Sequence, residues 1–211
     1  MADVIPYGTA EDQRDLIHHA VQSLTNGQIV GLPLESGYVA ATHAVIPEAV
    51  ARLAELSDRV TLMPRSPHDA LDFLPQLGRS PAKLVMRGWP GPIILEFPAS
   101  TTSCGVGAAL PESVLTLGGD PIAFRVSSAT IPAEIGRYVP GPLAVSREFV
   151  TVEELFSTLG TEPGLIIDNG PVEFPRGATT IKVSENEWSV VSEGAVTPRN
   201  VKRMTNEGIV F

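Results

Sequence analysis

The sequence predicts an α/β fold, a mixed β-sheet flanked by helices, in a single domain over residues 1–211. Apolar residues with helical spacing alternate along the chain with short apolar runs typical of buried strands. Turns that contain Gly or Pro separate these segments. A length of 211 residues, 43% of them hydrophobic, suits one larger α/β unit with a sizeable core. The pattern contains about seven or eight strands and six or seven helices, as expected for a helix-covered sheet.

The first elements are a helix and a buried strand. A capping box at Thr9 and Asp12 is expected to open the helix, and Asn26-Gly27 to end it. One helical face carries the apolar residues Leu16, Ile17, Ala20, Val21 and Leu24. The strand at 29–32 should stop near Pro33, which lacks an N–H group, so the polar side chains that follow would project from a strand end. Ligands often bind at such ends in open α/β sheets.

The rest of the chain alternates between the two patterns. Ser66, Ser80 and Thr151 are expected N-caps, and Pro47 and Pro198 are expected first helical residues. Helices are therefore predicted from 47 to about 57, over 67–77, 81–88, 133–139 and 151–159, and from 198 onward. Strands are predicted over 93–97, 114–117, 122–126, 143–145, 164–167, 179–183 and 187–191.

Composition and charge exclude several classes of protein. The net charge of -9 repels nucleic acid unless the 15 basic residues gather on one face, so RNA binding is disfavoured. The N-terminal segment lacks the pattern of a secretory signal, and no apolar run approaches the ~18 residues of a membrane span. A single cysteine, Cys104, cannot form an internal disulfide. We therefore expect a cytoplasmic protein.

No metal or nucleophile motif is evident. The four histidines, His18, His19, His43 and His68, lack the spacing of a zinc site. The TSCGVGA segment around Cys104 contains G-x-G, but the longer phosphate-binding fingerprint is incomplete. Neither a Walker loop nor a G-x-S-x-G elbow is present. We expect no metal site, and an ordinary loop around Cys104.

Six segments stand out in order: PLESGYVA at 33–40, WPGPIIL at 89–95, IAFRV at 122–126, GPL with Ser146 at 141–146, IIDNG at 166–170 and TTI at 179–181. Together they resemble the YrdC-like family, which includes threonylcarbamoyl-AMP synthase. The family motifs are P-T-E-T-x-Y-G-L, W-P-G-P-L-T, R-x-P, G-P-L…S-x-N, D-x-G and S-T-V. W-P-G-P is the most specific match. The resemblance implies a YrdC-like twisted mixed β-sheet flanked by helices.

The resemblance also implies a pocket and a reaction. Members of this family join ATP, L-threonine and bicarbonate into L-threonylcarbamoyladenylate and pyrophosphate. The adenylate then serves modification of adenosine 37 in tRNA. Such a nucleotidyltransferase would hold no tightly bound cofactor and would take ATP with Mg²⁺ as substrate. The residues implied to bind substrate or nucleotide are Glu35, Ser36, Tyr38, Arg59, Arg125, Ser146, Thr179 and Thr180. No protein nucleophile is implied.

Four positions depart from the family pattern. Ser57 stands where the K-x-R motif has lysine, so only Arg59 is kept, and Glu148 replaces the asparagine of S-x-N. Leu34 replaces the first threonine of the opening motif, and Ser192 replaces the arginine of a C-terminal R-x-G. Two lost charge-assisted contacts of roughly 1.5 to 3 kcal/mol each would weaken nucleotide binding about a thousandfold.

Three functions stay open on the sequence. The first is a divergent adenylate-forming synthase. The second is a non-catalytic YrdC-like module that binds a nucleotide, another metabolite or double-stranded RNA. The third is sugar-phosphate chemistry like that of dihydroxybutanone-phosphate synthase, which would need a carboxylate-built Mg²⁺ site, and the sequence shows no matching acidic motif.

Overall fold

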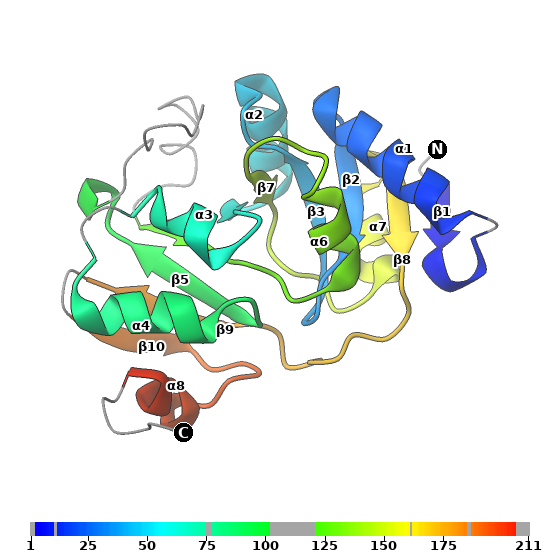
Figure 1. Ribbon diagram of the computed structural model, residues 1–211. Helices are drawn as coiled ribbons and strands as arrows, with labels where there is room; N and C mark the ends of the chain where they lie inside the picture. Colours follow the sequence, from blue (N-terminus) through cyan, green and yellow to red (C-terminus); the bar gives the residue numbers. More distant parts are fainter. Residues whose placement is uncertain are drawn as a thin grey trace.

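The computed structural model describes residues 3–10, 12–74, 77–101, 121–160, 162–184 and 187–205. Within these ranges ten strands form one mixed sheet (Figure 1) in the order β1-β8-β2-β3-β7-β4-β6-β5-β9-β10. The strands are β1 (Asp3–Pro6), β2 (Ile29–Pro33), β3 (Tyr38–His43), β4 (Thr61–Met63), β5 (Ile93–Phe97), β6 (Ile122–Phe124), β7 (Leu143–Val145), β8 (Pro163–Asp168), β9 (Thr179–Val183) and β10 (Trp188–Ser192). The predicted mixed α/β fold is confirmed.

The sheet contains both parallel and antiparallel neighbours. The pairs β1–β8, β2–β8, β4–β6 and β5–β9 are parallel. The pairs β2–β3, β3–β7, β4–β7, β5–β6 and β9–β10 are antiparallel. Segments far apart in sequence thus become neighbours, and β2, β3 and β7 lie side by side as the third, fourth and fifth strands of the sheet.

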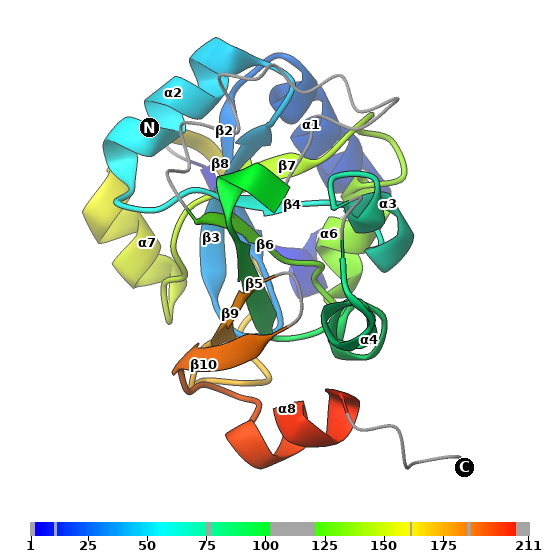
Figure 2. The ribbon, with the colours of Figure 1, turned by 90° about the vertical axis from the view of Figure 1, so that its left-hand side faces the viewer.

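Helices cover both faces of the sheet. The helices are α1 (Gln13–Thr25), α2 (Pro47–Leu56), α3 (Pro67–Leu71), α4 (Arg79–Gly88), α6 (Thr130–Ile135), α7 (Val152–Leu159) and α8 (Pro198–Thr205), with short 3-10 turns η1 (Tyr7–Thr9) and η2 (Ala99–Thr101). Figure 2 shows α1 and α6 on one side of the β2–β3 half and α2 and α7 on the other. Because both faces are covered, β2 and β3 are buried along their whole length.

Strand alternation divides the apolar side chains between two cores. Val39 and Ala41 of β3 pack in the core that includes α1 and α6. Tyr38 and Ala40 of the same strand pack in the core that includes α2 and α7. This period of two is what a pleated strand imposes. The sheet therefore separates two regions in which a site could form.

The N-terminal helix begins later than the sequence suggests. Asp12, rather than Thr9, is the N-cap of α1, and its carboxylate accepts hydrogen bonds from the N–H groups of Arg14 and Asp15. Thr9 belongs to η1 instead. The expected end of the helix is confirmed, since Asn26 is the C-cap and Gly27 has a φ of 72° that only glycine adopts readily.

The other helix boundaries are partly confirmed. Ser66 and Thr151 cap α3 and α7 through their side chains. The helix predicted over 67–77 ends at Leu71, and α4 starts at Arg79 with Gly78 as its N-cap, so the expected cap at Ser80 is wrong. The helix predicted over 133–139 is α6, which lies earlier in the chain.

Three strands escape the sequence analysis. They are β1, β3 and β4. β1 and β4 are only four and three residues long, and β3 pairs both with the preceding β2 and with the distant β7. The count of seven or eight strands is therefore too low for the described part of the chain. The strand predicted over 114–117 and the loop around Cys104 lie outside the described residues.

The last helix packs on α4 beside the β9–β10 end of the sheet (Figure 1). Val201 of α8 is fully buried, and Arg87 of α4 donates a hydrogen bond of 3.0 Å to the carbonyl of Met204. Among the described residues, no helix combines the length and the apolar character needed to cross a membrane.

Candidate functional site

The turn between β2 and β3 delivers two of the predicted site residues. The N–H of Leu34 donates to the carbonyl of Gly37 at 2.7 Å, which closes the turn around Glu35 and Ser36. Gly37 lies so close to the next segment that a Cβ atom would stand 2.9 Å from the carbonyl oxygen of Phe149. Two backbone hydrogen bonds between Tyr38 and Phe149 then hold residue 148 alongside the turn.

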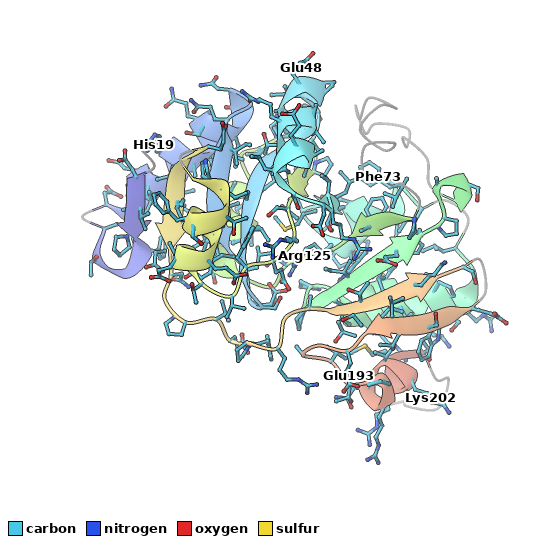
Figure 3. The ribbon with its side chains drawn as sticks, turned by 180° about the vertical axis from the view of Figure 1, so that it is seen from behind. His19, Glu48, Phe73, Arg125, Glu193 and Lys202 are labelled. Carbon is cyan, nitrogen blue, oxygen red and sulfur yellow. The ribbon has the colours of Figure 1, made fainter. Side chains whose placement is uncertain are left out.

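Arg125 follows β6 and lies at the centre of the molecule (Figure 3), with only 1% of its surface exposed. Its Nη2 atom is 3.0 Å from Oε1 of Glu35, and its Nη1 atom is 2.7 Å from Oε1 of Glu148. Nη2 also lies 3.3 Å from Oγ of Ser36. We call these four residues, Glu35, Ser36, Arg125 and Glu148, the Arg125 cluster. Nε of Arg125 has no hydrogen-bond partner among the described residues.

Glu148 is held at three points. Ser36 donates to its Oε1 at 2.5 Å, and the N–H of Ala178 donates to its Oε2 at 2.9 Å. Burial favours the neutral form of this carboxyl, but Arg125 and the hydrogen bonds from Ser36, Arg125 and Ala178 outweigh burial. They lower the pKa of Glu148 below its usual 4.5. Glu148 is therefore an anion at neutral pH.

Glu35 uses both of its oxygens. Oε1 faces Arg125, and Oε2 accepts hydrogen bonds from Oγ of Ser127 at 2.5 Å and from the N–H of Ser128 at 3.2 Å. The cluster thus contains one guanidinium and two carboxylates. With both carboxylates ionised it carries one excess negative charge, which opposes a phosphate group at this place.

Ser146 and Ser57 hold backbone rather than an open pocket wall. Oγ of Ser146 accepts from the N–H of Ala40 at 3.0 Å and donates to the carbonyl of Arg147 at 2.8 Å. Oγ of Ser57 accepts from the N–H of Arg147 at 3.1 Å and donates to the carbonyl of Arg59 at 2.7 Å. Both hydroxyls therefore tie β3, the end of α2 and the segment after β7 together.

The neighbouring cations have partners of their own. The guanidinium of Arg59 forms an ion pair with the buried carboxylate of Glu96 in β5. The guanidinium of Arg147 lies 4.3 Å from the centre of the Phe149 ring, a cation–π contact. The pairing with Glu96 engages Nη2 of Arg59 and offsets the positive charge that a ligand phosphate would meet there.

The hydroxyl of Tyr38 bonds to the segment after β8. This hydroxyl donates to Asp168 at 2.9 Å or to the carbonyl of Gly170 at 2.6 Å, and it accepts from the N–H of Asn169 at 3.2 Å. Burial, followed by the hydrogen bond to Asp168, raises the pKa of Tyr38, so the phenol stays protonated. Tyr38 fixes the segment after β8.

The two threonines lie on β9. Oγ1 of Thr179 donates to the carbonyl of Val196 at 2.8 Å and accepts from the N–H groups of Gly194 and Val196. Thr180 is buried opposite Ile94 of β5. The Thr179 hydroxyl thus closes the turn that leads into α8.

Of the predicted site residues, Glu35, Ser36 and Arg125 contact one another through hydrogen bonds. The other predicted site residues bond to different parts of the described structure. Sequence reasoning identified Glu148 only as a departure from a motif, and it missed Ser127 and the Ala178 N–H. A signal for Glu148 was present, since an acid that replaces an amide beside a buried arginine can pair with it. Within the described residues, no group of three or more His, Cys, Asp or Glu side chains could hold a metal ion.

Comparison with protein families gives a clear result. The sequence model of the Sua5, YciO and YrdC family, described as "Telomere recombination", matches residues 22–194. The chain belongs to this family. No curated protein matches the chain significantly. Membership confirms the resemblance seen in the six sequence segments.

Solved structures confirm the fold. Sua5 of P. abyssi in complex with L-threonine superposes with a TM-score of 0.80 at 18% identity, covering 98% of this chain and 61% of that one. E. coli YciO superposes with a TM-score of 0.77 at 19% identity, covering 95% and 100%. HypF in its phosphate- and nucleotide-bound form gives 0.62 at 14%, covering 88% and 31%. The chain thus spans about three fifths of the length of P. abyssi Sua5.

Proposed function

We propose that this family member is a non-catalytic small-molecule-binding protein, which does not form L-threonylcarbamoyladenylate. The observation that carries this proposal is the pairing of Glu148 with Arg125 at 2.7 Å. In the family pattern the same position is an asparagine, a neutral amide that can donate a hydrogen bond. A carboxylate cannot donate when ionised, and here it neutralises the cation that a nucleotide would use.

The energetics support a lost triphosphate site. Two like charges 4 Å apart repel by about 4 kcal/mol at an effective dielectric constant of 20. A phosphate that approached Arg125 would meet both Glu35 and Glu148, which already occupy the guanidinium. Ser57, which replaces the family lysine, is engaged with backbone groups and supplies no compensating charge.

A ligand of amino-acid size fits this proposal better than ATP. Sua5 of P. abyssi was solved with L-threonine, and we propose a ligand of that class for this chain. An amino acid brings one carboxylate and one ammonium, so it is neutral overall and avoids most of the repulsion that a triphosphate meets. The synthase remains the alternative against which the proposal is tested.

The decisive experiment measures turnover. The purified protein is incubated with ATP, Mg²⁺, L-threonine and bicarbonate, and pyrophosphate and the adenylate are quantified, with an active synthase in parallel. We expect neither product from the wild type. Formation of both products by the wild type would overturn the proposal.

A substitution makes the reasoning specific. Glu148→Asn restores the family residue and frees Arg125 of one carboxylate, so we expect tighter ATP binding by about tenfold or more, since a hydrogen bond to a charged group contributes roughly 1.5 to 3 kcal/mol. Glu153→Asn, an exposed acid on α7, is the matched control and should leave ATP affinity unchanged. Isothermal titration calorimetry measures the affinity of the wild type and of both variants for ATP and for L-threonine. Equal ATP affinity of wild type and Glu148→Asn would remove the role given to Glu148, and absence of any L-threonine binding would remove the ligand class.

A further inference from the structure

A separate cavity of about 390 Å³ opens beside the β2–β3 turn. Three segments form it together with Tyr7: residues 33–35, 128–131 and 169–173. Its volume lies within the range of small-molecule sites. Ser36, Arg125 and Glu148 are absent from the described residues that line it. We call it the Glu173 cavity.

The walls of the Glu173 cavity combine polar groups with an apolar patch. Leu34 and Ile131 belong to the core shared with α1 and α6, so this wall lies on the α6 side of the sheet. The lining also includes three residues that carry hydroxyls and one that carries an amide, namely Tyr7, Ser128, Thr130 and Asn169. Such a wall suits a ligand with an apolar body and one polar end.

The charged groups at the Glu173 cavity are anionic. Among its described lining residues, Glu35 and Glu173 are the charged ones, and none is Lys, Arg or His. Glu35 shares Arg125 with Glu148, so Arg125 leaves the pair of carboxylates with excess negative charge. Asp168 stands next to the lining, since its Oδ1 accepts from the N–H of Gly170 at 2.8 Å. An anionic ligand would meet Glu173 and would find no Lys, Arg or His on the described lining.

Charges of both signs lie beyond the cavity near Tyr7. Tyr7 also lines a neighbouring groove that contains Glu134, Arg14 and Arg137. Burial and, after it, the charge of Glu134 raise the pKa of Tyr7, so its hydroxyl stays a hydrogen-bond donor and acceptor. The two arginines lie in the groove and outside the lining of the Glu173 cavity.

We propose that the Glu173 cavity binds a small organic cation, a primary amine on an apolar body, with the ammonium at the Glu173 rim and the body against Leu34 and Ile131. The carboxylates, the apolar wall and the volume each match one part of such a ligand. The inference is independent of the proposed function, because the Arg125 cluster and the Glu173 cavity are lined by different residues except for Glu35.

Three probes with a common phenethyl body separate charge from shape. Phenethylamine, phenethyl alcohol and phenylpropionate present a cation, a neutral hydroxyl and an anion on the same ring. Amide chemical-shift changes at Thr130, Asn169 and Gly170 of the full chain report occupancy of the cavity by NMR titration. We expect the amine to bind most tightly, the alcohol more weakly and the acid not at all. Equal or tighter binding of the acid, or no shift with any probe, would overturn the proposal.

Variants test the location. Glu173→Gln should weaken amine binding about two- to fivefold, the size expected for an exposed ion pair, and leave alcohol binding unchanged. Val172→Trp places a large side chain on the half-buried loop and should abolish the shifts with both probes. Glu48→Gln on α2 (Figure 3) is the control and should change neither. A reference spectrum first shows that each variant is folded. If the amine then causes the same amide chemical-shift changes in Glu173→Gln and in Val172→Trp as in the wild type, the assignment is overturned. These outcomes say nothing of turnover, so they are distinguishable from failure of the proposed function.

Discussion

Arg125 supplies the positive charge that compensates two carboxylates inside this protein. Two carboxylates, Glu35 and Glu148, contact it at 3.0 and 2.7 Å in a region where water is excluded. A buried ion pair adds little net stability compared with apolar packing, yet removal of one partner leaves uncompensated charge. The cluster therefore explains both the position of the turn at 34–37 and the sensitivity expected of this site.

Removal of the Arg125 guanidinium should destabilise the folded protein strongly. We expect Arg125→Leu to lower the free energy of unfolding by about 3 to 5 kcal/mol, because two buried carboxylates then face each other without a cation. Arg65→Leu, which breaks the exposed pair with Asp69, is the control and should cost less than about 1 kcal/mol. Urea denaturation followed by circular dichroism measures both. Similar losses in the two variants would show that the buried pairing does not govern stability.

Glu148 should give the protein a specific acid sensitivity. Its pKa is lower in the folded state than the usual 4.5, so the folded state binds fewer protons than the unfolded state in acid. Its contribution to stability is complete above pH 4.5 and is lost as the pH falls through the folded-state pKa. Glu148→Gln should therefore show a flatter fall in unfolding free energy below pH 4.5 than the wild type. Parallel curves for wild type and variant, with Glu153→Gln as reference, would contradict this.

Sequence patterns predicted which residue types gather near Arg125, but not their partners. Glu35 and Ser36 come from the segment at 33–40, and Arg125 comes from the segment at 122–126, both of which resemble family motifs. The hydroxyls of Tyr38 and Thr179 looked equally available, and only the tertiary structure shows that Asp168 and the Val196 carbonyl accept from them. A side chain's hydrogen-bond partner depends on distant segments, which no local pattern contains.

At the scale of elements, β2 and β8 approach each other closely. A Cβ atom on Gly31 would stand 2.8 Å from Cγ1 of Ile166 in the neighbouring strand. We expect Gly31→Ala to destabilise the protein by about 1 to 3 kcal/mol, the usual cost of overpacking a core. Gly164→Ala in β8, where nothing lies within 4 Å, is the matched control and should be nearly neutral. Thermal and urea unfolding compare the two, and equal stability of both variants would contradict the packing argument.

The elements that the sequence predicted are those with long apolar patterns or explicit caps. Thr151 and Asn26-Gly27 mark helix ends with side-chain and backbone chemistry that works locally. The strands β1 and β4 have four and three residues, too few to show a period, and β3 contains two alanines in six residues. β1 and β4 are held by sheet partners far along the chain, and β3 by both β2 and the distant β7, so local propensity carries little information about these strands.

At the scale of the whole molecule, strand order is the feature that sequence reasoning could not reach. The order β1-β8-β2-β3-β7-β4-β6-β5-β9-β10 joins strands separated by more than a hundred residues. It places residue 148 beside the turn at 34–37, and the Arg125 cluster exists only because of that proximity. Family membership supplied the architecture, whereas the charge balance inside it became visible only in the structure.

The distribution of basic residues bears on RNA binding. Six of the 15 basic side chains lie on two packed helices that contain no acidic residue: Arg79, Lys83 and Arg87 on α4, and Arg199, Lys202 and Arg203 on α8. Lys202 lies on the lower edge of the molecule in Figure 3, where Glu193 is its labelled neighbour. This segregation gives the acidic chain one basic region against a net charge of -9.

We expect that basic region to attract RNA only through screened charge. A labelled RNA hairpin should associate weakly at about 50 mM salt and dissociate at about 200 mM, because each phosphate contact releases counterions and a few contacts cannot offset the net repulsion. Lys202→Glu combined with Arg203→Glu should abolish the low-salt binding, whereas Arg14→Glu, on α1 away from this region, should not. Fluorescence anisotropy across the salt series measures this. Binding that survives the higher salt, or that responds equally to Arg14→Glu, would show that RNA is recognised by a built site rather than by the charge of α4 and α8.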